Sequence, residues 1–167
     1  MSDWSTIHGH AQQLDQLRRT AQAGRLGHAY LFLGPEGIGK RTFARQLAKC
    51  LLCYQTGDAE LAACGTCSSC KQVNAETHPD LLEVGLPEEK NVVPIRLIAG
   101  EDDERGRAGL CYDLSLSPME GTRRVAILDS ADHLEEAGAS ALLKTLEEPP
   151  GHVVFVLATT EPHKVVE

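Results

Sequence analysis

The stretch from Gly34 to Lys40 has the residue types and spacing that most directly indicate chemistry. It fits the pattern G-x-x-x-x-G-K. Glycines such as Gly37 and Gly39 let backbone N–H groups close around a phosphate, and Lys40 can reach the outer phosphates of a nucleotide. The start of a following helix would add its positive dipole end. We therefore predict a phosphate-binding loop, with a glycine turn of no function as the alternative.

The residue after the lysine does not fit a nucleotide hydrolase. Hydrolases with this loop carry Ser or Thr there, and its hydroxyl ligates Mg²⁺. Here the position is Arg41, with Thr42 one place later. One helical step turns a side chain by about 100°, so Thr42 cannot simply replace that residue. We expect Arg41 and Thr42 to lie at a site for ATP and Mg²⁺ in which hydrolysis is impaired.

The run Arg124 to Leu128, in which a basic residue leads into continuous apolar residues, predicts a buried strand of a parallel sheet that ends in an acid, Asp129. Such a carboxylate can hold Mg²⁺ through water beside a phosphate loop. The next residue is commonly a Glu that polarises the attacking water, but here it is Ser130. Asp132 and His133 are candidate substitutes, although we favour helix-capping and surface roles for both.

A second buried strand, Val153 to Ala158, delivers Thr159 and Thr160 at its carboxyl end. A hydroxyl at this place can sense the outer phosphate or its attacking water. With the hydrolytic positions altered, Asp129 and Thr160 stay candidates, and the sequence identifies no catalytic residue.

Four cysteines form the other strong pattern. Cys53, Cys64, Cys67 and Cys70 have the spacing C-x10-C-x2-C-x2-C, and four thiolates so placed can close a tetrahedron around Zn²⁺. We predict a structural zinc module at about residues 53–78. A redox pair, disulfides or free buried thiols are the alternatives, and Cys50, one helical turn before Cys53, could compete as a ligand.

Length and composition fit one α/β domain spanning residues 1–167. No run approaches 18 apolar residues, and the N-terminus lacks a basic start followed by an apolar core, so we expect a cytoplasmic protein without a membrane anchor. The net charge of −8 argues against a free-standing nucleic-acid binder, because a phosphate backbone must meet a basic surface.

The pattern of apolar residues predicts the elements that position these motifs. Helices are expected at Ala11–Ala23, Phe43–Leu52 and Glu136–Glu148, and strands at Ala29–Leu33 and Leu81–Val84 besides the two above. Residues 85–109 are polar and weakly patterned. There we predict a loop with an extended piece at Val92–Ile95, followed by a helix from about Arg105 to Ser115.

The order of these motifs, with the segment ALLKTLEEPP at residues 141–150, resembles the first domain of bacterial clamp-loader subunits of the AAA+ class. These are the gamma/tau and delta-prime subunits of DNA polymerase III. The resemblance covers nearly the whole chain and implies a P-loop NTPase fold. By this resemblance, Gly34–Lys40 is the Walker A loop, Asp129 is the Walker B acid and Thr160 is the sensor 1 position. The four cysteines are the family's zinc ligands, and Ile7 to His10 lie near the adenine.

Arg41 and Ser130 resemble the delta-prime subunit rather than the ATP-hydrolysing gamma type. The resemblance then implies a rigid member of a hetero-oligomeric ring with gamma/tau and delta subunits, which loads the sliding clamp on primer-template DNA and completes a neighbour's ATP site. The arginine finger in Ser-Arg-Cys, the helical lid and the collar domain are expected beyond residue 167. An active gamma/tau-type ATPase and a zinc-centred interaction or redox module are the rival functions.

Overall fold

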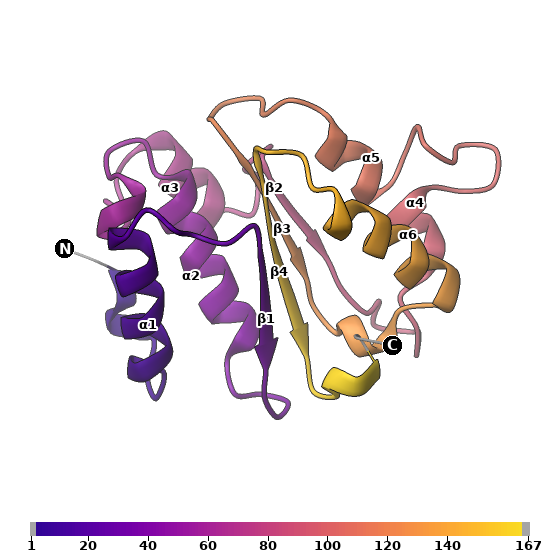
Figure 1. The fold of residues 1–167 in the computed structure, drawn as a ribbon, viewed down its shortest axis with the longest axis horizontal. Coiled ribbons are helices and arrows are strands. Elements are labelled where there is room, and N and C mark those ends of the chain that lie inside the picture. The colour runs from indigo at the N-terminus through magenta and orange to yellow at the C-terminus, as the bar shows by residue number, and fades with distance from the viewer. Residues whose placement is uncertain (1–2, 165–167) are drawn as a thin grey trace.

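Four parallel strands form a single sheet in the computed structural model, which describes residues 3–164 (Figure 1). Their order across the sheet is β1-β4-β3-β2, with β1 at Ala29–Leu33, β2 at Leu81–Val84, β3 at Arg124–Leu128 and β4 at Val153–Thr159. All four strands lie where the sequence predicts them. The two central strands, β3 and β4, are buried along their whole length, as expected for continuous apolar runs.

Helices cover both faces of the sheet, which gives three layers (Figure 1). One face carries α1 (Ala11–Gln22), α2 (Lys40–Leu52) and α3 (Ser68–Asn74), and the other carries α4 (Ile95–Ala99), α5 (Leu110–Ser115) and α6 (Glu136–Glu147). Short 3-10 helices occur at Asp3–Thr6, Asp58–Glu60, Ala131–His133 and Pro162–Lys164. Among the helices of residues 3–164, none is long and apolar enough to cross a membrane.

Alternate side chains of the central strands build two cores. Val125 and Ile127 of β3 pack with α1 and α2, in a cluster that also contains buried residues of the cysteine segment such as Leu61 and Val73. Ala126 and Leu128 pack on the other face with α4, α5 and α6. The cysteine segment therefore shares its core with α2 and the sheet.

The extended piece predicted at Val92–Ile95 is confirmed at Val93, which forms an isolated parallel bridge with Leu134, but it is wrong at Ile95, where α4 begins. The Glu135 carboxylate accepts a hydrogen bond from the Ile95 backbone N–H at 2.8 Å, which satisfies a donor at the start of the helix. Ile98 then packs at the place where Gly138 of α6 leaves room. The helix therefore depends on contacts about 40 residues away in the sequence.

The predicted helix at Arg105–Ser115 also begins too early, because α5 starts only at Leu110. Gly109, just before it, has a φ of +85°, and a Cβ atom there would lie 2.6 Å from the Gly100 backbone nitrogen. The close approach of the two backbones requires glycine and a non-helical conformation at this position. The chain therefore turns through residues 101–109 before it becomes helical.

A buried carboxylate fixes the amino-terminal end of the sheet, opposite the phosphate loop. The Asp80 side chain is fully buried and accepts hydrogen bonds from the backbone N–H groups of Met119 (2.7 Å), Glu120 (2.8 Å) and Gly121 (3.3 Å). The Arg124 Nε atom lies 3.4 Å from it, and that side chain is 5% exposed. Asp80 thus joins the start of β2 to the loop that leads into β3.

We predict that Asp80→Ala lowers the free energy of unfolding by about 3–5 kcal/mol, because it leaves the buried Arg124 guanidinium without its counter-charge. Urea denaturation measures the change. The control is Asp58→Ala, which breaks a more exposed pair with Arg123 and should cost at most about 1 kcal/mol. Equal losses in the two variants would contradict this role for Asp80.

Candidate functional site

The predicted phosphate loop joins β1 to α2. Gly37 and Gly39 have φ values of +76° and +96°, in the left-handed region that favours glycine, and Gly39 is the residue before the first turn of α2. Lys40 is the first helical residue, and its Nζ atom donates to the carbonyl oxygens of Gly34 (2.7 Å) and Pro35 (3.0 Å). The loop thus places an ammonium group and the start of a 13-residue helix together, an arrangement suited to an anion.

Arg41 is held toward the edge strand β2. Its Nη2 and Nε atoms donate to Glu83 Oε2 at 3.1 and 3.4 Å, and Arg45, one turn further along α2, donates to the same carboxylate at 2.7 Å. A guanidinium carries only donors, so it cannot ligate a cation. The residue after the lysine is therefore a cation anchored by Glu83, where a hydrolase has a magnesium-binding hydroxyl.

Asp129 follows β3 directly, and its Oδ1 atom accepts a hydrogen bond from the Ser130 backbone N–H at 3.0 Å. Ser130 has a φ of +60°, so the chain turns sharply as it leaves the strand. The structure thus presents one carboxylate and one hydroxyl at the place where hydrolases carry two carboxylates.

A cavity of about 440 Å³ lies between the phosphate loop and the carboxyl ends of β3 and β4. It brings together most of the predicted nucleotide-site residues. Its lining includes Gly37, Gly39, Lys40, Arg41, Thr42, Asp129, Ser130, Asp132, His133, Thr159 and Thr160. Gly34, which the sequence also places in the loop, does not line this cavity, but its carbonyl oxygen accepts a hydrogen bond from Lys40 Nζ.

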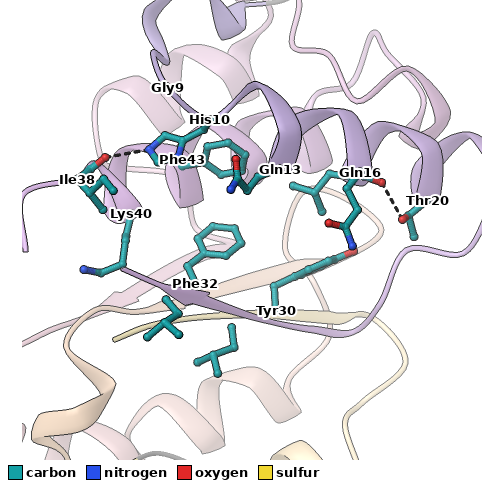
Figure 2. Close-up of a pocket in the computed structure, with 13 residues that line it drawn as sticks. Gly9, His10, Gln13, Gln16, Thr20, Tyr30, Phe32, Ile38, Lys40 and Phe43 are labelled. Carbon is teal, nitrogen blue, oxygen red and sulfur yellow. Dashed lines mark hydrogen bonds between the residues drawn. The ribbon is translucent and has the colours of Figure 1, made fainter. Parts of the chain in front are cut away.

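A second cavity of about 520 Å³ lies between α1 and β1 and also reaches Lys40 (Figure 2). His10 and Gln13 line it from the start of α1, and Phe32 lines it from β1. His10 Nε2 donates to the Ile38 carbonyl at 2.9 Å, which ties this wall to the phosphate loop. Ile7 instead packs against the core. Lys40 therefore lines both cavities.

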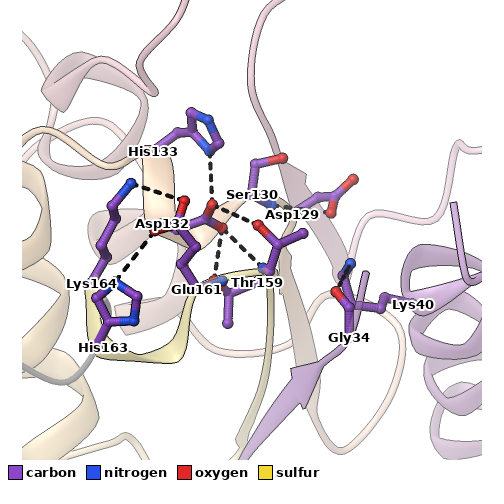
Figure 3. Close-up of polar contacts among 11 residues, drawn as sticks. Gly34, Lys40, Asp129, Ser130, Asp132, His133, Thr159, Glu161, His163 and Lys164 are labelled. Carbon is purple, nitrogen blue, oxygen red and sulfur yellow. Dashed lines mark hydrogen bonds and ion pairs between the residues drawn. The ribbon is translucent and has the colours of Figure 1, made fainter. Parts of the chain in front are cut away.

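The expectation of a capping or surface role for Asp132 is wrong. Its side chain is only 2% exposed, and it accepts hydrogen bonds from the hydroxyls of Thr159 (2.7 Å) and Thr160 (3.2 Å) (Figure 3). Burial raises the pKa of this carboxyl, but the bonds from Thr159 and Thr160 outweigh it, so the pKa stays below its usual range. Sequence reasoning missed this contact because no local pattern marks a bond across 27 residues.

The four predicted metal ligands converge. The Sγ atoms of Cys53, Cys64, Cys67 and Cys70 all lie within 4.8 Å of one another, so the cluster could hold a metal ion. Backbone N–H groups donate to three of the sulfurs: Cys64 to Cys53, Cys67 to Cys64 and Cys70 to Cys67, at 3.3–3.4 Å. Such bonds favour thiolates, the form that binds metals.

Cys50 does not belong to this cluster. Cys50 is a buried residue of α2 whose sulfur accepts a hydrogen bond from Gln46, and burial raises the pKa of its thiol to about 12. The Cys64 thiol has its pKa lowered to about 6, chiefly by the backbone N–H groups of Thr66 and Cys67. Burial also raises the pKa of Cys70, so among the converging sulfurs it is Cys64 that contrasts most clearly with the neutral Cys50 thiol.

Residues 9–167 match the protein family described as "DNA polymerase III, delta subunit". The chain belongs to this family. The match confirms the resemblance to clamp-loader subunits that the motifs predicted.

Curated relatives of two kinds are similar to this clamp-loader chain. It is 40% identical to DNA polymerase III subunit gamma/tau of Mycobacterium tuberculosis, over 86% of this chain and 23% of the relative. It is 36% identical to subunit tau of Escherichia coli, over 97% of this chain and 23% of that relative. It is 37% identical to subunit delta' of Pseudomonas aeruginosa, over 98% of this chain and 42% of that relative. The chain thus spans less than half the length of each of these relatives.

A solved structure supports the fold. The gamma subunit-related protein of Thermotoga maritima superposes with a TM-score of 0.53 at 20% identity, over 93% of this chain and 40% of that one. Identity to the gamma/tau and delta' relatives is similar, so the level of identity does not distinguish the two types of subunit.

We predict that cysteine reactivity follows the two thiol environments. In chelator-treated, reduced protein at about pH 7, Cys64 is mostly thiolate because its pKa is about 6, whereas Cys50 has a pKa of about 12 and is almost wholly neutral. Timed iodoacetamide labelling with peptide mass spectrometry should find Cys64 modified well before Cys50. Early modification of Cys50 in folded protein would contradict these environments.

Proposed function

We propose that this chain is the phosphate-loop domain of a delta-prime-type clamp-loader subunit, acting in DNA replication. It helps to load the sliding clamp on primed DNA and does not hydrolyse ATP itself. The observation that carries the proposal is the Arg41–Glu83 ion pair, which fixes a guanidinium at the position of the magnesium-binding hydroxyl.

The second hydrolytic position supports the same assignment. Ser130 follows Asp129, and a hydroxyl is a far weaker proton acceptor than the glutamate that polarises water in hydrolases of this architecture. Lys40, the glycines of the loop and the start of α2 keep the features of a phosphate cradle. Nucleotide binding by Gly34, Gly37, Gly39, Lys40, Arg41, Thr42 and Asp129, with Thr160 nearby, is thus compatible with slow or absent turnover.

An active gamma/tau-type ATPase is the second candidate function. The 40% identity to the gamma/tau subunit of M. tuberculosis favours it. It requires that another residue take over magnesium ligation and water activation. Asp129 could still contribute to the magnesium site, but Arg41 and Ser130 offer neither function in the observed arrangement.

We further propose that the cysteine cluster holds one structural Zn²⁺ in a module at about residues 53–78, within one domain that spans residues 1–167. The four converging sulfurs and their N–H donors fit the ion's preference for thiolate ligands. When bound, the metal would cross-link the end of α2 to the start of α3. A redox module is the competing interpretation of the same sulfurs.

The proposed partners are the gamma/tau and delta subunits, the sliding clamp and primer-template DNA, in the cytoplasm. The net charge of −8 argues against an independent DNA binder. Affinity for DNA would then belong to the assembled ring.

Reconstitution of the clamp loader with the intact protein tests the proposed role. Clamp loading on primed DNA should require this subunit. When the phosphate-loop lysine of every gamma/tau partner is replaced by alanine, ATP hydrolysis by the complex should fall to background although this subunit is unchanged. A complex with unaltered partners is the control. Substantial turnover remaining in the altered complex would favour the gamma/tau-type alternative.

Metal analysis tests the proposed zinc module. The purified protein should contain about one Zn²⁺ per chain, and Cys67→Ser should lose most of it, because three thiolates remain where four closed the site. Cys111→Ser is the matched control, since this half-buried thiol lies outside the cluster. A reversible disulfide in metal-free native protein would support the redox interpretation instead.

A further inference from the structure

The cavity beside the phosphate loop contains a buried anion that the proposed phosphate binding does not use. Asp132 lines this cavity together with Lys40 and Asp129. Figure 3 shows Lys40 on one side, the group around Asp132 on the other, and Asp129 between them. A chain of phosphates that starts at the lysine and extends toward the strand ends therefore approaches a fixed negative charge.

Asp132 also accepts hydrogen bonds from the hydroxyl groups at the end of β4. Thr159 and Thr160 each have one hydroxyl proton, and both donate it to this carboxylate. The Thr160 backbone N–H points to the same group, at 3.4 Å from Oδ1. In this arrangement neither threonine hydroxyl can donate to a phosphate, so the groups expected to sense an outer phosphate instead stabilise an anion.

A histidine also lies beside Asp132. His133 Nδ1 lies 3.2 Å from Oδ2, and a histidine is positively charged only when protonated. Lys164, drawn on the same side in Figure 3, pairs with Glu161 at 3.0 Å. The far wall of the cavity thus carries the Asp132 carboxylate, while the loop wall carries Lys40 and the start of α2.

We propose that Asp132 makes this cavity selective for a nucleoside diphosphate over the corresponding triphosphate. The inference rests on the proposed nucleotide binding by the phosphate loop and names the ligand class. The loop, Lys40 and the start of α2 serve the first two phosphates, and a third phosphate meets the Asp132 carboxylate without a free hydroxyl donor. Asp132 is thus a specificity-determining residue.

The test compares the affinities of ADP and of the slowly hydrolysed analogue ATPγS, with Mg²⁺, by isothermal titration calorimetry at about pH 8. The intact protein should bind ADP about tenfold more tightly. In Asp132→Asn, which keeps an acceptor for Thr159 but removes the charge, the preference should shrink by roughly five- to tenfold, mainly through tighter ATPγS binding. Asp102→Asn removes one charge at a 90% exposed side chain and should leave the preference unchanged.

Equal affinities of the unaltered protein for the two nucleotides would overturn the inference, and this result does not depend on the folding of any variant. An unchanged preference in folded Asp132→Asn would overturn it too. If the protein binds neither nucleotide, both the inference and the proposed nucleotide site are wrong. The proposed clamp-loading role would still be decided separately by the reconstitution experiment.

Discussion

Parallel pairing of β1, β4 and β3 is the constraint on which the candidate site depends. Leu33 pairs with Thr159, and Leu128 pairs with Leu157, so these strands end at the same edge of the sheet. The phosphate loop, Asp129 and Thr160 are the next residues along the chain. A hydrogen bond of 3.3 Å from the Gly34 N–H to the Thr159 carbonyl joins the first residue of the loop to the end of β4. Segments that are far apart in the sequence therefore form one cavity.

Two side-chain contacts change what this shared framework can do. Arg41 is anchored by Glu83 of β2, and Asp132 accepts hydrogen bonds from the two hydroxyl groups at the end of β4. Glu83 pairs with the charge of the Arg41 guanidinium, and Asp132 accepts the hydroxyl protons of Thr159 and Thr160. The fold of a nucleotide-binding domain is thus retained, while the groups needed for magnesium ligation and water activation are replaced. The proposed delta-prime role requires the framework but not the reaction.

Patterns that are local in the sequence predicted the corresponding structure well. Continuous apolar runs marked the strands, the glycine spacing marked the phosphate loop, and Cys64, Cys67 and Cys70 are close enough in sequence for their convergence to be expected. Long-range contacts account for the failures. The start of α4 depends on a bond to Glu135, and the burial of Asp132 depends on threonines 27 and 28 residues away. The sequence alone does not identify such polar partners, because the fold brings them together from distant segments.

The central claim is that this site keeps a phosphate cradle but has lost hydrolysis, and steady-state phosphate release by the purified protein tests it most directly. With saturating ATP and Mg²⁺, the account predicts a rate no greater than that of Lys40→Ala, because Arg41 and Ser130 supply neither a magnesium ligand nor a base. Turnover well above background that Lys40→Ala abolishes would contradict the account.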